Sequence, residues 1–149
     1  MREILFRGKA INREEGREYR TSYKNGDWVY GLVTKLYDER FELLPATMTN
    51  EYGISGIEVD HNTIGQYTGL TANGKEIFEG DIVKITGFHT TAIAAVKYGS
   101  SSEKSTSWGW YFDDNDGHTY FLVSRAFCED YNAIIIGNIH DNPELLKGE

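Results

Sequence analysis

A glycine-containing segment at residues 69–75 has the spacing of a phosphate-binding loop. Gly69 and Gly74 stand five positions apart, and Lys75 follows directly. In such a loop a Ser or Thr must follow the lysine to hold magnesium, whereas this chain has Glu76. Further acidic side chains at positions 79 and 81 would repel a phosphate, and the segment leads into a β-like run rather than a helix. The segment therefore predicts a tight turn and no nucleotide site.

An acidic segment at residues 113–117 has the composition of a calcium loop. Aligning Gly117 with the glycine that such a loop requires puts Phe112 and Val123 where oxygen ligands are needed. We interpret the segment as a solvated hairpin tip, and a weak surface cation site is the alternative.

Paired carboxylates leave a metal-dependent nuclease as the alternative function. The pairs are Asp113 with Asp114 and Glu129 with Asp130. Adjacent side chains on a strand point apart, so each pair is more typical of solvated charge than of a metal site.

The histidines and the cysteine form no zinc or nucleophile pattern. No two of the four histidines lie within four residues, and Cys128 has no cysteine partner. Glu129 and Asp130 beside Cys128 would raise its pKa and suppress the reactive thiolate. We assign no catalytic residue, no metal and no cofactor, and expect a protein that is not an enzyme.

Two tryptophans are the best candidates for a binding surface. Trp108 and Trp110 share one face of a predicted strand, next to the polar, serine-rich segment at residues 99–107. Aromatic side chains mostly fill small β cores, but exposed rings also act as rigid platforms for peptides. We predict that these two residues take part in binding.

Charge is distributed unevenly along the chain. Of a net charge of -8, residues 1–35 contribute 8 Lys+Arg against 5 Asp+Glu, and residues 36–149 contribute 7 against 18. Because nucleic-acid binding requires clustered positive charge, direct binding to nucleic acid is disfavoured. The acidic portion instead favours a basic partner.

Cysteine content and hydropathy point to the cytoplasm. A single cysteine excludes an internal disulfide framework, which indicates a reducing compartment. The first residues lack the apolar region of a secretory signal, and no run approaches the roughly 18 apolar residues of a spanning helix. We expect a soluble protein that does not contact a membrane.

Short apolar runs between glycine corners predict a mainly β protein. Asn73-Gly74 predicts a tight hairpin turn, Asp60 to Thr63 an Asx turn, Gly69 the end of a strand, and residues 46–55 a loop. Helices are expected only at residues 124–130 and, capped by Asn142 and begun by Pro143, at residues 144–147. Strands are predicted at residues 28–36, 40–44, 64–68, 76–78, 82–86, 92–98, 108–112, 120–123 and 133–139.

These elements predict two regions. Residues 1–59 would form an N-terminal β-rich region with a hairpin, and residues 60–149 an SH3-like, partly open barrel that ends in a short helix. An SH3-type barrel suits five or more short strands that include one long exposed hairpin.

Three blocks of the sequence share one pattern: the opening residues 1–8, the central residues 63–84 and the closing residues 136–146. They resemble the YopX family of bacteriophage and prophage proteins. The resemblance implies an SH3-type barrel in the C-terminal region and transfers no catalytic residue. The residues that carry it are Arg7, Gly8, Trp28, Gly31, Asp60, Thr63, Gly65, Gln66, Thr68, Gly69, Gly74, Ile77, Glu79, Gly80, Asp81, Gly137, Asn138, Asn142 and Pro143.

Four polar residues in this pattern are not explained by turns alone: Gln66, Thr68, Glu79 and Asp81. We predict that they hydrogen-bond the central block to another part of the fold or to a second subunit. The resulting hypothesis is a noncatalytic accessory protein in the bacterial cytoplasm, which binds a host or phage protein or associates into a homo-oligomer.

Overall fold

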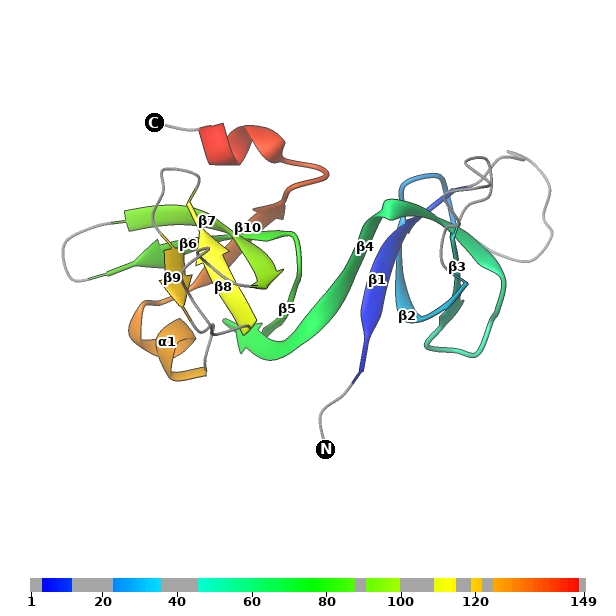
Figure 1. Ribbon diagram of the computed structural model, residues 1–149, viewed down its shortest axis with the longest axis horizontal. Helices are drawn as coiled ribbons and strands as arrows, with labels where there is room; N and C mark the ends of the chain where they lie inside the picture. Colours follow the sequence, from blue (N-terminus) through cyan, green and yellow to red (C-terminus); the bar gives the residue numbers. More distant parts are fainter. Residues whose placement is uncertain are drawn as a thin grey trace. The chain divides into compact units, whose positions relative to one another are not determined.

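A computed structural model describes residues 4–11, 23–35, 46–87, 91–99, 109–114, 119–121 and 125–147 (Figure 1). The protein is mostly β, with two antiparallel sheets, which confirms the predicted fold class. The elements are β1 (Phe6–Ala10), β2 (Trp28–Lys35), β3 (Ala46–Asn50), β4 (Ile57–Ala72), β5 (Lys75–Phe78), β6 (Asp81–Thr86), β7 (Thr91–Gly99), β8 (Gly109–Asp113), β9 (Thr119–Phe121), α1 (Arg125–Asp130), β10 (Ile134–Asn138) and the 3-10 helix η1 (Pro143–Lys147).

Contacts group the chain into two compact units, Met1–Gln66 and Tyr67–Glu149, and each is described by itself. The division falls inside β4. The sequence-based boundary between residues 59 and 60 stays a prediction, as does the SH3-type character of the barrel. In the described residues, no helix has both the length and the apolar character needed to cross a membrane.

The first unit is a closed ring of four antiparallel strands. β1 pairs with β2, β2 with β3 and β3 with β4, and β4 returns to pair with β1. The alternating side chains that point inward form a buried cluster of Ala10, Val29, Ala46, Met48, Ile57 and Val59. Gly8 lies against this cluster, where an added Cβ would be 3.2 Å from Met48 Sδ.

The prediction of a loop at residues 46–55 is wrong for residues 46–50, because Ala46–Asn50 forms β3. Its inward positions include Ala46 and Met48, and at the end of the strand Asn50, which is buried. Asn50 Oδ1 accepts hydrogen bonds from the backbone N–H groups of Tyr52 (3.0 Å) and Ile54 (2.9 Å). The amide therefore closes the turn between β3 and β4, and its polarity hides the strand from a hydropathy pattern.

β4 is a single strand of 16 residues that contains two irregularities. The predicted Asx turn is confirmed, since Asn62 N donates to Asp60 Oδ1 at 3.0 Å. It interrupts β4 as a bulge opposite β1 and does not precede a separate strand. Gly69, with φ of 85°, is likewise a bulge position, so the prediction that it ends the strand is wrong.

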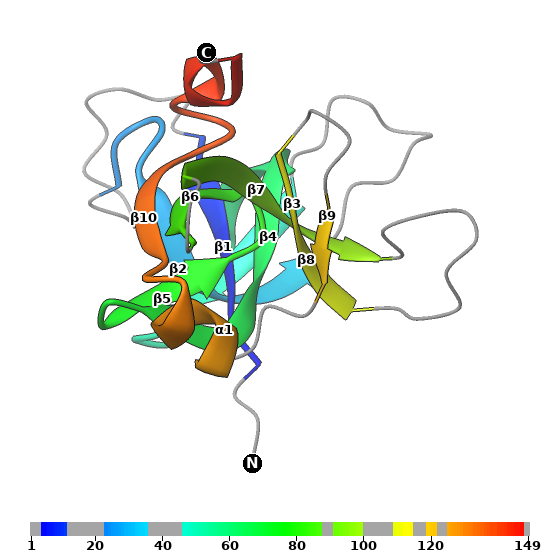
Figure 2. The same cartoon turned by 90° about the vertical axis from the view of Figure 1, so that its left-hand side faces the viewer.

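The second unit is built on a five-stranded sheet with the order β10-β6-β7-β8-β9. The end of β4 pairs with β5 through the predicted Asn73-Gly74 turn, in which φ is 51° and 79°. The core of the unit includes Ile77, Val83, Val96 and Phe112. The predicted helices are confirmed as α1 and η1, which lie at opposite ends of this unit (Figures 1 and 2).

Candidate functional site

The candidate binding site is an aromatic pair that lies at the end of β7 and the start of β8. Tyr98 and Trp110 are directly opposed in the antiparallel ladder, and their ring centroids lie 4.9 Å apart at an interplanar angle of 61°. This is an edge-to-face arrangement, which aromatic pairs prefer to a face-to-face sandwich.

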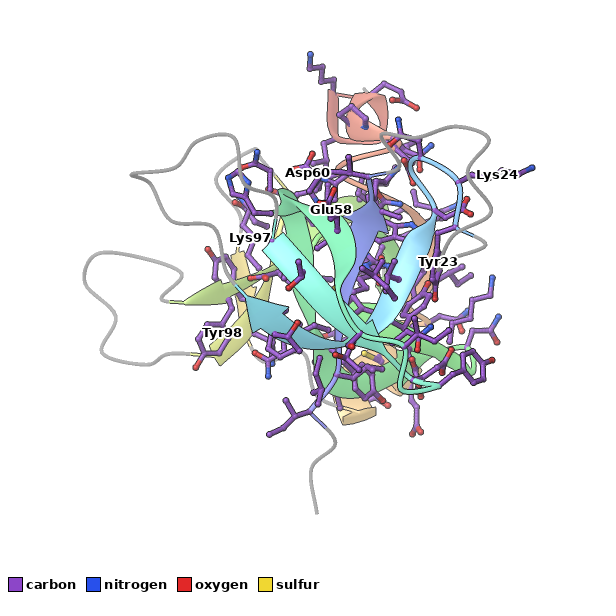
Figure 3. All side chains as sticks on the ribbon, turned by 90° about the vertical axis from the view of Figure 1, so that its right-hand side faces the viewer. Tyr23, Lys24, Glu58, Asp60, Lys97 and Tyr98 are labelled. Carbon is purple, nitrogen blue, oxygen red and sulfur yellow. The ribbon has the colours of Figure 1, made fainter. Side chains whose placement is uncertain are left out.

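Strand alternation explains why this pair lies at the margin of the core. Val96 and Phe112 form the next pair on the same face of the sheet, two residues from Tyr98 and Trp110, and both are fully buried. Tyr98 lies two residues beyond Val96 and is 57% exposed. Figure 3 shows Tyr98 and its neighbour Lys97 projecting in different directions from β7.

Trp110 contributes to both the core and the surface. Its side chain is partly buried and packs against the core of the second unit. Its Nε1 donor is buried, and no described group accepts a hydrogen bond from it. The ring of Trp110 therefore supports the exposed Tyr98 from the side of the core.

The second predicted tryptophan, Trp108, lies outside the described residues. The structure does place the four polar residues of the central block. Gln66 is half-buried on β4 opposite Phe6, in the first unit. Glu79 is half-buried between β5 and β6.

Thr68 and Asp81 bond to the same peptide unit of β5, the one that joins Ile77 to Phe78. Thr68 Oγ1 donates to the carbonyl of Ile77 at 2.8 Å, and Phe78 N donates to Asp81 Oδ2 at 2.8 Å. Both side chains are buried, and these hydrogen bonds stay inside the central block, where they fix the corner between β4, β5 and β6. A role for these residues in binding stays a prediction.

The opposite face of β7 and β8 carries an ion pair. Lys97 Nζ lies 2.7 Å from Asp113 Oδ2, and both side chains are partly exposed. An exposed pair of this kind contributes about 0–1 kcal/mol. Asp113, one of the carboxylates considered for a nuclease, therefore faces a cation, while the rest of that acidic segment beyond Asp114 lies outside the described residues.

The described part of the chain contains no group of three or more His, Cys, Asp or Glu side chains that could hold a metal ion. His61 is exposed and His140 half-buried, whereas His89 and His118 are outside the described residues. Cys128 is buried, and burial, followed by the negative charge of Glu129, raises the pKa of its thiol. The direction agrees with the sequence-based interpretation of an unreactive cysteine.

A second aromatic cluster lies on the outer face of the first unit. Arg7 Cζ is 4.3 Å and Lys9 Nζ is 5.3 Å from the ring centroid of Trp28. Arg7 is only 6% exposed. Because Arg7 and Trp28 are among the residues of the family resemblance, this contact supplies a structural reason for both.

Comparison with known proteins identifies the family of this chain. A model of the family described as YopX protein matches residues 10–147, which is nearly the whole sequence. The chain belongs to the YopX family. Among solved structures, this YopX protein is similar to protein EF1440 from Enterococcus faecalis, with a TM-score of 0.51, 25% identity, and coverage of 97% of this chain and 98% of that one. A search of curated proteins gave no match.

In this YopX protein, several of the residues that carried the resemblance have steric roles. An added Cβ at Gly31 would overlap the carbonyl oxygen of Thr49 on the neighbouring strand. At Gly137 it would lie 2.5 Å from Asn142 Oδ1. The side chain of Asn138 is held in the same corner, since its Oδ1 accepts from the backbone N–H groups of His140 and Asp141.

Tyr98 is the residue of the aromatic pair that the sequence analysis did not single out. Its position opposite Trp110 depends on the ladder register, and its exposure depends on where the neighbouring strands stop. The only signal in the sequence was alternation with the buried Val96.

Proposed function

We propose that this YopX protein is a noncatalytic phage or prophage accessory protein of the bacterial cytoplasm that binds a host or phage protein. The observation that carries the proposal is the Tyr98–Trp110 pair, in which an exposed ring packs edge to face on a half-buried one. Aromatic side chains of this kind supply large contact areas at low entropic cost.

Charge favours a basic partner. Residues 67–149, the unit that carries the aromatic pair, contain 6 Lys+Arg against 12 Asp+Glu. Such a field accelerates encounter with a positively charged surface, and the effect weakens as salt rises.

A pull-down from host cells, followed by mass spectrometry and titration of the purified partner, tests the proposal. Tyr98→Ala removes the exposed ring, and we expect it to weaken binding of the identified partner at least tenfold. Trp110→Ala removes the ring on which Tyr98 packs, so it should weaken binding as well. Trp108→Ala is included because the sequence predicted a role for that residue.

Tyr52→Ala is the matched control, because Tyr52 is 81% exposed in the first unit and this variant loses the same group. The proposal fails if Tyr98→Ala and Tyr52→Ala bind the partner equally, or if wild type and Tyr98→Ala retain identical sets of proteins.

Self-association is a second candidate, and the edge strand β10 favours it. β10 is the last strand of its sheet and has the sequence Ile-Ile-Ile-Gly-Asn, in which Ile134 is 41% exposed. Ile134→Lys should convert any oligomer to monomer in light scattering. A monomeric wild type at high protein concentration would dismiss this candidate.

A further inference from the structure

A pocket of about 520 Å³ lies between the β4–β5 hairpin and α1 in the second unit. Its lining consists of Gly69, Leu70, Thr71, Asn73, Gly74 and Glu129. The volume is within the roughly 300–1,000 Å³ typical of small-molecule sites. All of these residues except Glu129 belong to the segment whose glycine spacing resembled a phosphate-binding loop. The hairpin that they form does border a pocket, but the lining of this pocket does not suit a phosphate.

The backbone of the hairpin is shaped by a bulge. The ladder pairs Tyr67 with Phe78 and next Thr71 with Glu76, so β4 carries extra residues between these two pairs. Thr68 Oγ1, which donates to β5, also accepts from Leu70 N at 3.1 Å and thereby fixes the bulge. Because Gly69 has a positive φ, the bulge is reached without backbone strain.

The chemistry of the lining is that of a cation site. Among the described residues that line the pocket, Glu129 is the one with an ionisable side chain, and Thr71 and Asn73 add neutral oxygens. Glu76, directly opposite Thr71 in the ladder, places a second carboxylate on the same face of the hairpin. Leu70 supplies the apolar part of the wall. The negative charge excludes phosphate and favours an organic cation with an aliphatic body.

We propose that this pocket binds an alkylammonium group, with Glu129 as its charge partner, the oxygens of Thr71 and Asn73 as further acceptors, and Leu70 against the alkyl chain. An ammonium has three donors and no acceptor, which matches this set of oxygens. Its alkyl chain is apolar and would pack on Leu70, as the stem of a lysine side chain packs on an apolar surface. The inference goes beyond the proposed function and involves none of the aromatic residues used there.

Titration followed by amide chemical shifts of the ¹⁵N-labelled protein tests this inference. The probes are n-butylammonium chloride and Nα-acetyl-lysine methylamide, and the neutral control is Nα-acetyl-norleucine methylamide. We expect saturable shifts at the amides of Gly69 to Gly74 with both cations and none with the neutral control. Tighter binding of the lysine probe would assign the site to a protein partner, whereas tighter binding of butylammonium would assign it to a small amine.

Two variants with the same charge change separate the site from the general field of the protein. Glu129→Gln should weaken binding of either cation about tenfold, which corresponds to about 1.4 kcal/mol. Asp130→Asn removes the neighbouring charge, which does not line the pocket, and should change binding less than twofold. Thr71→Val tests the contribution of the hydroxyl without altering charge.

The inference is overturned if the amides of the hairpin do not shift, if the norleucine control shifts them equally, or if the two acidic variants behave alike. These outcomes are independent of the pull-down, because loss of the protein partner in Tyr98→Ala leaves the amine titration unaffected.

Discussion

The guanidinium of Arg7 lies over the indole of Trp28, with Arg7 Cζ 4.3 Å from the ring centroid. Arg7 is on β1 and pairs with Tyr30, while Trp28 pairs with Lys9, so the two residues are diagonal neighbours on adjacent strands. A cation–π contact here joins two strands of the ring in the first unit.

A double-mutant cycle measures this contact. Arg7→Met keeps the aliphatic stem and Trp28→Leu removes the ring, and we expect a coupling of about 0.5–2 kcal/mol in the free energy of unfolding in urea. Lys9→Met provides the comparison, since Lys9 Nζ is farther from the ring, at 5.3 Å, and should couple more weakly. Additive effects of Arg7→Met and Trp28→Leu would contradict the interpretation.

Gly31→Ala should be among the most destabilising single substitutions in the first unit. The new Cβ would overlap the carbonyl oxygen of Thr49, which belongs to the backbone of β3 and cannot rotate away. We expect a loss of about 3 kcal/mol or more in urea unfolding, or failure to fold.

Gly109→Ala is the matched control for Gly31→Ala. Gly109 is also a strand residue, but no atom of the described residues lies within 4 Å of its added Cβ, so the substitution should change stability by less than about 1 kcal/mol. Equal effects of the two substitutions on the free energy of unfolding would contradict the close approach of β3 to Gly31.

Asn138→Ala should destabilise the corner between β10 and η1. Asn138 is buried, accepts two backbone hydrogen bonds and donates from Nδ2 to Asp141 Oδ2 at 3.0 Å. Leaving those backbone donors unsatisfied costs about 1–3 kcal/mol in thermal or urea unfolding. Asn62→Ala, at an exposed position of β4, should cost less than about 0.5 kcal/mol, and a larger loss there than at Asn138 would refute the assignment.

Cys128 should make stability fall at alkaline pH. Burial and the charge of Glu129 raise the pKa of the folded thiol, so the unfolded chain releases its proton first as pH rises. The stabilising contribution is therefore complete below about pH 8.5, the ordinary thiol pKa, and is lost as pH rises through the higher pKa of the folded state. Urea unfolding between pH 7 and 10 should show a steeper decline for wild type than for Cys128→Ala, and parallel curves would be the opposite result.

Most of the second unit could be predicted from the sequence, because its signals are local. Asn73-Gly74 forms the expected turn, since both residues accept positive φ, and apolar runs between turn residues locate β6, β7, β8 and β10. α1 also matches its predicted segment closely.

The wrong predictions concern residues that favour a turn but form another feature in the structure. Asp60 and Gly69 have the chemistry of turns, but in β4 they form bulges, because β1 and β5 pair with the strand on both sides of them. β3 was missed because its inward Asn50 is polar, and its burial is explained by the turn that it closes and by its hydrogen bond to Tyr23. The predicted strand at residues 40–44 lies outside the described residues.

The candidate site was predicted only in part, for a related reason. Trp110 could be predicted from its position beside a polar hairpin. The exposure of Tyr98 could not, because it depends on where the buried core under β7 ends. The pocket beside α1 requires Glu129 and Gly69, which are 60 positions apart in the sequence, to meet in the fold.

The two edge strands of the second sheet, β10 and β9, differ in their described length, and this difference bears on how copies of the protein could assemble. In the described residues, β9 spans three positions and β10 five. Head-to-tail growth into a filament would join one edge to the other, and the described part of β9 presents three residues to that junction. A two-fold pairing that uses β10 twice needs no contribution from β9, and it stops at two copies.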